Sequence, residues 1–118
     1  CIFADMVPTI KANKDNMYHS ALKGYTTATD LADYLVKKGL AFRDAHDVVG
    51  KAVSYGLKEN KDLSEFSLDE LKKLNSLIEK DVFDVISLEG SINARNHLGG
   101  TSPKQVSMAI KAGRKSIK

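Results

Sequence analysis

Apolar residues recur at helical spacing through the middle of the chain, and residues 24–53 show this pattern most clearly. The first part places Leu31, Tyr34 and Leu35 three or four residues apart, which makes one face of a helix apolar. The pattern starts again after Gly39. Its second set of apolar residues consists of Ala45, Val48, Val49, Ala52 and Val53. The stretch therefore predicts two amphipathic helices joined at a glycine, with a buried seam between them.

Two local signals predict where the first of these helices begins and ends. Thr27 and Asp30 have the spacing of a capping box, in which each side chain accepts a hydrogen bond from the other residue's backbone N–H. Gly39 stands where a helix commonly ends in a left-handed residue. Both signals point to a helix over about ten residues before the glycine.

Weaker helical patterns precede this hairpin. Residues 1–12 are interpreted as the end of a helix, in which Pro8 introduces a kink or a restart. Asn13 is the predicted N-cap of the next helix, and Gly24 is its predicted end. The apolar positions of this helix are Met17, Ala21 and Leu22, and His19 lies off their stripe as a solvated side chain.

After the hairpin, the polar residues 58–65 predict a loop. Ser67 and Glu70 then form a second capping box, with Phe66 able to pack on Leu71 one turn inside the helix. The predicted buried face of this helix comprises Leu68, Leu71, Leu74, Leu77 and Ile78.

A short helix is predicted to begin at Asp81 and to end at Gly90. Its apolar residues are Val82, Phe83, Val85 and Ile86. Residues 91–98 are polar and are expected to form one or two helical turns at most. Gly99 and Gly100 then interrupt the chain.

The last predicted helix has a complete set of start signals. Ser102 is placed as the cap, Pro103 as the first helical residue, and Gln105 as the side chain that returns to the cap. The residues expected to point inward are Val106, Ala109, Ile110, Gly113 and Ile117.

The fold class follows from these elements. No segment alternates polar and apolar residues between hairpin turns, and no internal repeat is evident. The 118 residues have the size of a single domain. The sequence thus predicts an all-α protein, a small irregular or orthogonal bundle of about six or seven helices.

Composition narrows the range of partners. The net charge of +3 is mildly basic, and Lys111, Arg114, Lys115 and Lys118 cluster at the end of the chain. Cations favour the negative end of a helix, and no aromatic residues are interleaved for base stacking, so the cluster indicates helix stabilisation more than nucleic-acid binding.

The single cysteine, Cys1, excludes an internal disulfide and suits a reducing cytosol. No apolar run is long enough to span a membrane, and no basic leader precedes an apolar core. Cys1 runs directly into apolar residues, which disfavours a lipid-modified terminus, and it has no partner base that would make it a nucleophile.

Candidate chemistry is sparse. Asp30 and Asp33 share one helix face and could bind a metal ion with a third ligand, but a helix-start charge and a surface role are the favoured interpretations. His46 borders the buried stripe. It could act as an acid or base, although a hydrogen bond within the packing is favoured.

The most polar cluster lies near the paired glycines. It comprises Asn93, Arg95, Asn96 and His97, followed by Gly99, Gly100 and Thr101. A glycine pair beside a helix start can offer free N–H groups to a carboxylate. The favoured alternative is a tight connection that lets two helices cross closely, with Thr101 or Ser102 as the cap.

Several ordered motifs resemble the C-terminal domain of the argininosuccinate lyase family. They are residues 24–36 (GYTTATDLADYLV), residues 42–46 (FRDAH), Arg95-Asn96, Gly99-Gly100-Thr101 and Pro103. The resemblance covers nearly the whole chain. It implies that the chain is the third domain of such a lyase, and that residues 1–12 end a helix of its central domain.

The resemblance also implies an activity for the full-length protein. Members of the family cleave argininosuccinate to arginine and fumarate by β-elimination, without a metal ion or an organic cofactor. They are cytoplasmic homotetramers of arginine biosynthesis, with active sites shared between subunits.

No catalytic or substrate-binding residue can be carried over to this chain. The family's mobile serine loop, Ser-Ser-x-Met-Pro-Gln-Lys-Lys-Asn, is absent, and none of His19, His46 and His97 follows a threonine as the family's acid–base histidine does. We therefore expect this chain alone to be inactive. Two departures from the family pattern, Ala41 in place of proline and Ser102 in place of alanine, affect only helix starts.

The alternative function is a non-enzymatic helical module that binds nucleic acid through a helix-turn-helix around Gly39. The basic character of the chain favours it. Asp44 and Asp47 oppose it, because they lie near the start of the second helix, where phosphates would be repelled.

Overall fold

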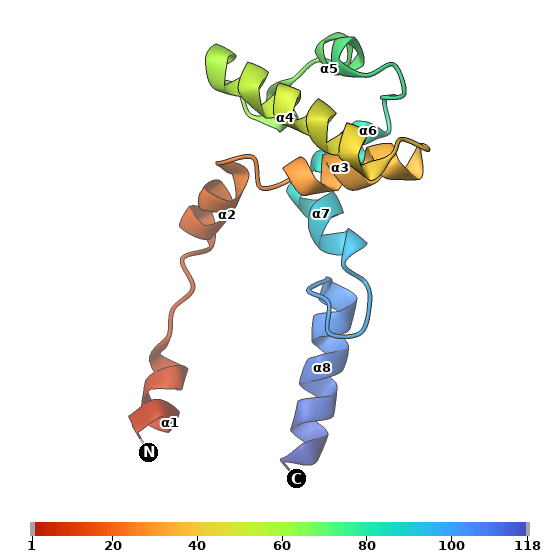
Figure 1. Cartoon of the computed structure of the whole chain (residues 1–118). Helices are drawn as coiled ribbons and strands as arrows, with labels where there is room; N and C mark the ends of the chain where they lie inside the picture. Colours follow the sequence, from red (N-terminus) through yellow and green to blue (C-terminus); the bar gives the residue numbers. More distant parts are fainter. Residues whose placement is uncertain (1, 118) are drawn as a thin grey trace.

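The computed structural model describes residues 2–117, and within that range it contains eight α-helices, two 3-10 helices and no strand. This confirms the all-α prediction, and Cys1 lies outside the described residues. The helices are α1 (Ile2–Met6), α2 (Lys14–Leu22), α3 (Ala28–Lys37), α4 (Phe42–Glu59), α5 (Leu68–Leu74), α6 (Val82–Ile86), α7 (Leu88–Ala94) and α8 (Pro103–Ser116). The 3-10 helices are η1 (Val7–Thr9) and η2 (Leu63–Glu65). Figure 1 shows their arrangement.

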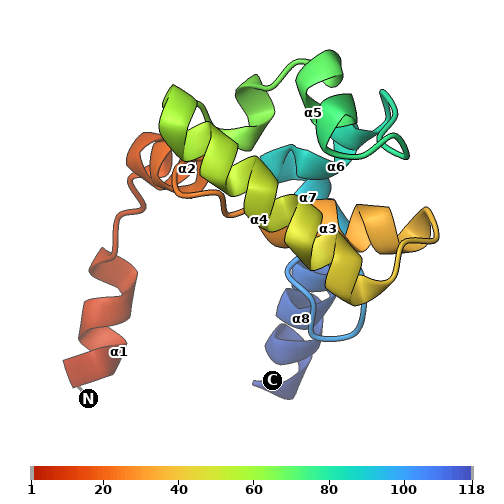
Figure 2. The ribbon, with the colours of Figure 1, turned by 45° about the horizontal axis from the view of Figure 1, so that its top comes forward.

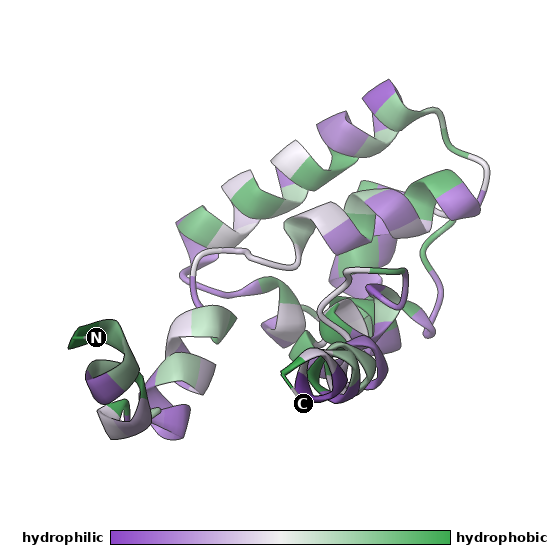
Figure 3. Cartoon of the chain, turned by 90° about the horizontal axis from the view of Figure 1, so that it is seen from below, coloured by the Kyte–Doolittle hydropathy of each residue, from purple (hydrophilic) through white to green (hydrophobic). Residues whose placement is uncertain are grey.

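Helices α3 to α7 form a packed head, and α3 and α4 are its hairpin. Leu31 and Leu35 of α3 and Ala45 and Ala52 of α4 are all completely buried. Val53 is only partly buried, but it packs against the same core. Figure 3 shows polar and apolar residues alternating along α4, as expected for a helix that buries one side. The rest of this core comprises Ala32, Tyr34, Val48, Val49, Leu63, Phe66, Leu71, Ile78, Val82 and Ile86. The predicted buried seam is therefore confirmed.

The end of α3 is the predicted left-handed glycine. Gly39 has φ +100°, and its N–H donates to the carbonyl of Val36 at 2.9 Å. The next N–H, of Leu40, donates to the carbonyl of Leu35 at 3.0 Å. Together these two bonds make a Schellman motif, which satisfies carbonyls at the end of the helix and turns the chain towards α4.

The start of α3 differs from the prediction. Thr27 makes no side-chain cap hydrogen bond, so the predicted capping box with Asp30 is wrong. The Asp30 carboxylate instead lies buried against α7. Asp30 therefore pairs with Ser91, which is distant in the sequence, and not with the neighbouring Thr27.

The polar stretch 58–65 is more ordered than predicted. Helix α4 continues to Glu59 and ends at Asn60, whose φ of +53° is left-handed. After it, η2 buries Leu63 and is closed by a capping box between Asp62 and Glu65. The prediction of a plain loop is wrong because the short turn has an apolar residue to bury and its own caps.

The second predicted capping box is confirmed. The Ser67 hydroxyl accepts from the N–H of Glu70 at 3.2 Å, and the Glu70 carboxylate accepts from the N–H of Ser67 at 2.7 Å. Phe66 and Leu71 are both buried in the core, as the predicted staple requires. On the predicted buried face, Leu71 and Ile78 are buried, Leu68 and Leu74 are partly buried, and Leu77 is exposed.

Gly90 does not end a helix, as was predicted. It lies inside α7, where a Cβ atom on it would approach the carbonyl oxygen of Asp84 to 1.8 Å. Helix α6 ends four residues earlier, at Ile86, and Ser87 caps α7 by accepting from the N–H of Gly90 at 2.9 Å. The glycine therefore permits the close approach of α6 and α7.

Two arms extend from the head, and Figures 1 and 2 show them apart from each other on the same side of it. The N-terminal arm comprises residues 2–22 with α1 and α2, and the C-terminal arm is α8. Asn13 caps α2 as predicted, accepting from the N–H of Asn16 at 3.2 Å. The molecule is consequently elongated, with principal extents of 55 × 29 × 22 Å.

The apolar side chains of both arms are uncovered. None of the residues of α1, α2 or α8 is buried. The prediction that the apolar face of α8 points inward is therefore wrong within residues 2–117, and Met17 of α2 is likewise exposed. The exposed apolar residues of the arms include Ile2, Phe3, Met6, Val7, Ile10, Val106, Ile110 and Ile117. Over the described part of the chain, no helix has the length and apolar character needed to cross a membrane.

Candidate functional site

The predicted polar cluster before the paired glycines is partly assembled around Asp30. Arg95, just after α7, places its Nη1 3.0 Å from Asp30 Oδ1, and the Ser91 hydroxyl donates to Asp30 Oδ2 at 2.7 Å. The same guanidinium also donates to the carbonyl of Ser91. The Asp30 side chain is only 6% exposed, so these contacts neutralise a carboxylate that burial would otherwise destabilise. Arg95 and Asp30 thus join α7 to α3.

The following residues form the connection to α8. Asn96 Oδ1 accepts from the Ser102 hydroxyl at 3.3 Å and from Gln105 Nε2 at 3.2 Å. The Ser102 hydroxyl caps α8 by accepting from the N–H of Gln105 at 3.4 Å. The cap is as predicted, but the Gln105 side chain turns to Asn96 instead of back to Ser102.

These contacts bear on the less favoured interpretation of the glycine pair, an anion-binding site. The N–H of Gly100 donates to the carbonyl of His97 at 2.8 Å, and a Cβ on Gly100 would lie 2.0 Å from the carbonyl oxygen of Arg95. The glycine pair therefore makes a tight turn, as the favoured interpretation of the sequence requires, but α7 and α8 are not among the helix pairs that pack closely in residues 2–117. Asn93 and Thr101 are exposed beside it.

The other candidate residues do not converge on this cluster. Asp33 and His19 are exposed. His46 is also exposed, next to the Phe42 ring at 6.4 Å between centroids, so the prediction that it is hydrogen-bonded within the packing is wrong. Across residues 2–117, no three His, Cys, Asp or Glu side chains are placed to hold a metal ion.

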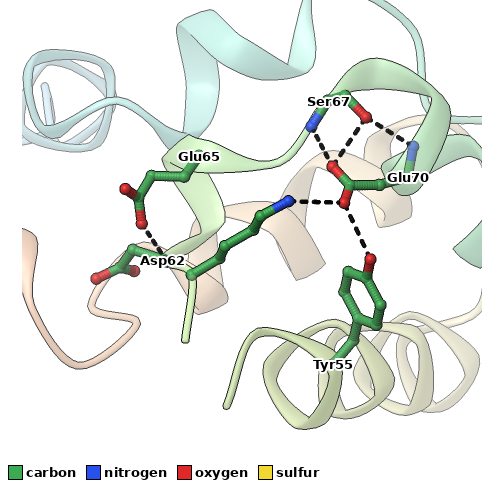
Figure 4. Close-up of polar contacts among 6 residues, drawn as sticks. Tyr55, Asp62, Glu65, Ser67 and Glu70 are labelled. Carbon is green, nitrogen blue, oxygen red and sulfur yellow. Dashed lines mark hydrogen bonds and ion pairs between the residues drawn. The ribbon is translucent and has the colours of Figure 1, made fainter. Parts of the chain in front are cut away.

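A second polar cluster, which sequence analysis found only in part, centres on Glu70 (Figure 4). Its carboxylate accepts from the Ser67 N–H at 2.7 Å and the Ser67 hydroxyl at 2.8 Å. It also accepts from Lys61 Nζ at 3.0 Å and from the Tyr55 hydroxyl at 2.9 Å. The capping box predicted the contacts to Ser67. The contacts to Lys61 and Tyr55 have no periodic signal in the sequence.

The hydrogen bonds in this cluster shift the pKa values of Glu70, Lys61 and Tyr55. The Ser67 N–H, then Lys61, the Ser67 hydroxyl and Tyr55 lower the pKa of Glu70 from 4.5 to about 2. Conversely, the hydrogen bond to Glu70 raises the pKa of Lys61 and of the Tyr55 phenol. The carboxylate is thus kept ionised and fully engaged, which suits a structural clasp between α4, η2 and α5 and leaves no free base.

A third cluster ties the end of α3 to the start of α6. The Tyr34 hydroxyl donates to Asp81 Oδ1 at 2.5 Å and accepts from the N–H of Glu79 at 3.1 Å. Lys38 pairs with Glu79 and, at 3.1 Å, with Asp81. The hydrogen bond to Glu79, followed by that to Asp81, raises the pKa of Lys38, whereas the Tyr34 hydroxyl is the main cause that lowers the pKa of Asp81.

Taken together, the clusters join elements that are distant in sequence, and their charged groups have partners within the chain. None of the three places a base, a nucleophile and an anion-binding group around a common space. An open, mostly apolar groove of about 590 Å³ lies elsewhere, between residues 98–101 and the Val106 and Ala109 side of α8.

Comparisons with known proteins find similar sequences over nearly the whole chain. The family model described as "Argininosuccinate lyase C-terminal" matches residues 25–93. The argininosuccinate lyase of Ruthia magnifica is 67% identical over 117 residues, which are 99% of this chain and 24% of that protein. That of Chromohalobacter salexigens is 59% identical over 115 residues, covering 98% of this chain and 25% of its own. The chain thus spans about a quarter of the length of the curated relatives it matches.

A solved structure of an EDDS lyase variant with bound fumarate shares the fold. Its TM-score is 0.79 over 88% of this chain and 23% of its own length, at 24% sequence identity. This likeness concerns the fold alone, whereas the family model and the lyase sequences confirm the resemblance seen in the motifs. Because that model matches more than half of the chain, the chain belongs to the argininosuccinate lyase C-terminal family.

Proposed function

We propose that this chain is the C-terminal domain of an argininosuccinate lyase, an enzyme that cleaves argininosuccinate to arginine and fumarate by β-elimination in arginine biosynthesis. The observation that carries the proposal is the 67% identity to a protein named argininosuccinate lyase across nearly the whole chain. The chain corresponds to only about a quarter of that protein, so the remaining parts of the enzyme supply the reaction.

The proposal assigns residues 1–118 to the third domain of the lyase and residues 1–12 to the end of a central-domain helix. The uncovered apolar side chains of α1 support this assignment, because Ile2 is 83% and Phe3 is 70% exposed. Isolated exposed apolar residues are common, but a contiguous row on one short helix is typical of an interface. The full-length enzyme is proposed to be a cytoplasmic homotetramer.

The chain itself is proposed to be inactive. Its polar clusters are engaged in internal pairs, and the lyase loop and the threonine-preceded histidine are not in its sequence. The domain therefore has a structural role in the enzyme and provides surfaces that contact its other parts. The catalytic residues of the enzyme lie in the rest of the polypeptide.

The test is a fumarate absorbance assay with argininosuccinate as substrate. The full-length polypeptide that contains this chain should release fumarate, whereas the 118-residue chain alone should release none above background. An inactive full-length protein would contradict the proposed reaction. Turnover by the chain alone would contradict the proposal that the catalytic residues lie outside it.

A further inference from the structure

The N-terminal arm joins the head at a bend made of two left-handed residues (Figure 1). Gly24 has φ +82° and Tyr25 has φ +57°. Glycine adopts this conformation freely, whereas for a tyrosine it is uncommon and unfavourable. Within residues 2–117, the only other non-glycine residue with a positive φ is Asn60, the C-cap of α4. An unfavourable backbone persists only where its surroundings hold it, so the contacts of Tyr25 indicate what fixes the bend.

The Tyr25 side chain reaches from the bend to the end of α4. Its hydroxyl donates to the carbonyl of Lys61 at 2.9 Å, and its ring packs against the core of the head. Burial raises the pKa of the Tyr25 phenol, and the nearby carboxylates of Asp62 and Glu65 raise it further. The hydroxyl therefore stays protonated at neutral pH and remains a hydrogen-bond donor.

Gly56 of α4 leaves the space in which this contact forms. It is buried, and a Cβ atom on it would lie 2.7 Å from the Tyr25 hydroxyl and 2.6 Å from the carbonyl oxygen of Lys61. Both distances are shorter than packed atoms tolerate. Gly50 in the same helix is different, because a Cβ there would meet no atom within 4 Å. The crowding at Gly56 is thus specific to the place where Tyr25 meets the end of α4.

A second contact ties the arm to the bend. The Thr26 hydroxyl donates to the carbonyl of Ala21, in the last turn of α2, at 2.7 Å and so bridges Gly24. The end of α2 also lies close to η2, since Leu22 and Ser64 line one open cavity of about 270 Å³. None of the residues of α2 is buried. The contacts at the bend, and not burial of the arm, therefore hold the arm at its angle to the head.

We propose that Tyr25 is a lock that fixes the angle between the N-terminal arm and the head. Its ring and hydroxyl hold the left-handed bend against the end of α4, in the space beside Gly56. The hydrogen bond from Thr26 to Ala21 extends this fixed orientation to α2. The lock itself stands independently of the proposed function. Because residues 1–12 are assigned to a central-domain helix, the lock also sets how the head is held on the rest of the enzyme, and this consequence rests on the proposed function.

Spin labels on the arm and on the head measure this angle directly. In the 118-residue chain, Cys1→Ser removes the native thiol. Ser20→Cys in α2 and Lys72→Cys in α5 then provide two exposed labelling sites. Double electron–electron resonance reports the distribution of the distance between the two labels. This parent pair should give a narrow distribution with one maximum, and a broad distribution in the parent would overturn the lock.

Two pairs of matched variants test the contact. Tyr25→Phe removes the hydroxyl and should raise the population of displaced arm orientations by about twofold to tenfold, as expected for one lost hydrogen bond. Tyr18→Phe makes the same change on an exposed tyrosine of α2 and should leave the distribution as in the parent. Gly56→Ala should widen the distribution further, because its Cβ displaces Tyr25, whereas Gly50→Ala should not. Variants that behave alike within either pair would overturn the lock.

A third variant separates the side chain from the backbone. Tyr25→Gly suits the left-handed conformation but lacks the anchor, so it should widen the distribution as Gly56→Ala does. A narrow distribution in Tyr25→Gly would show that the backbone alone sets the arm and would overturn the lock. Circular dichroism checks the helical content of each variant, and Tyr25→Phe decides the matter if Gly56→Ala unfolds.

The distances are measured without substrate, which separates the two proposals. A failed lock leaves the proposed function standing, and a full-length protein that does not cleave argininosuccinate leaves the lock standing.

Discussion

The head and the C-terminal arm both contain amphipathic helices, but the apolar residues are buried in the head and exposed in the arm. In α3, Leu31 and Leu35 are completely buried, whereas in α8 the corresponding apolar residues Val106 and Ile110 are nearly half exposed. Both helices have a hydroxyl residue at the N-cap position, Thr27 or Ser102, and both have apolar residues at helical spacing. The difference is that α3 packs against α4 and α6 and is hydrogen-bonded to α7, whereas α8, within residues 2–117, has side-chain hydrogen bonds to the rest of the chain only at its N-terminal end.

The comparison shows what an amphipathic pattern encodes. The pattern predicts that one face of a helix is buried, but it does not identify the part of the molecule that packs against that face. Substitutions of the same kind in the head and in the arm should therefore differ in size, and sometimes in sign, in this chain.

The largest expected contrast concerns the aliphatic cores. Leu35→Ala should destabilise the chain by about 2–5 kcal/mol, because it removes a fully buried side chain and leaves a cavity. Ile110→Ala in the arm should change the stability by less than about 0.5 kcal/mol. Urea unfolding followed by circular dichroism measures both. Similar losses for the two variants would mean that α8 is covered in this chain.

Replacing a glycine by alanine should lower the stability of the head but raise the helical stability of the arm. Gly90→Ala should cost about 1–3 kcal/mol, because the new Cβ would meet the Asp84 carbonyl and force α6 and α7 apart. Gly113→Ala should favour α8 by up to about 1 kcal/mol through helix propensity. The readouts are the unfolding midpoint for the first variant and the helical ellipticity for the second. A neutral Gly90→Ala would refute the close approach of the two helices.

Arginine truncation should distinguish a paired from an exposed cation. Arg95→Ala leaves the Asp30 carboxylate, which is 6% exposed, without its ion pair, and should destabilise by about 1–3 kcal/mol. Arg114→Ala on the exposed arm is the control and should stay within about 0.5 kcal/mol of the parent. The two unfolding free energies, measured at neutral pH, would become equal only if the Asp30–Arg95 pair contributed nothing.

The smallest expected effect is the acid dependence of the Glu70 clasp in the head. The pKa of Glu70 is lowered from 4.5 to about 2 in the fold, so its ionised form stabilises the native state above pH 4.5. This contribution is lost progressively as the pH falls from 4.5 to about 2. Thermal melts should show Glu70→Gln less stable than the parent at about pH 6 and nearly equal to it at about pH 2.

The exposed carboxylate of Glu89 provides the control for this titration. Glu89→Gln should melt close to the parent across the same pH range, since its side chain has no comparable set of donors among residues 2–117. A Glu70→Gln variant whose difference from the parent widened in acid would contradict the lowered pKa of Glu70.

Much of the fold could be predicted because its signals are local. The stripe of α3, the left-handed Gly39 and the Ser67–Glu70 capping box each involve residues within about five positions of one another, where spacing alone fixes the geometry. The family could also be recognised from ordered motifs in the sequence. The identity of the chain and its helical character were thus contained in the order of its residues.

The tertiary structure decided which distant groups meet. Asp30 prefers Ser91 and Arg95, 61 and 65 positions away, over its neighbour Thr27. Gly90 is explained by the carbonyl of Asp84 on an adjacent helix and not by a helix end. His46, which lies at the edge of the stripe by spacing, is turned outward. Hydrogen bonds and packing act only over a few ångströms, so long-range pairs leave no periodic trace in the sequence and exist only once the chain has folded.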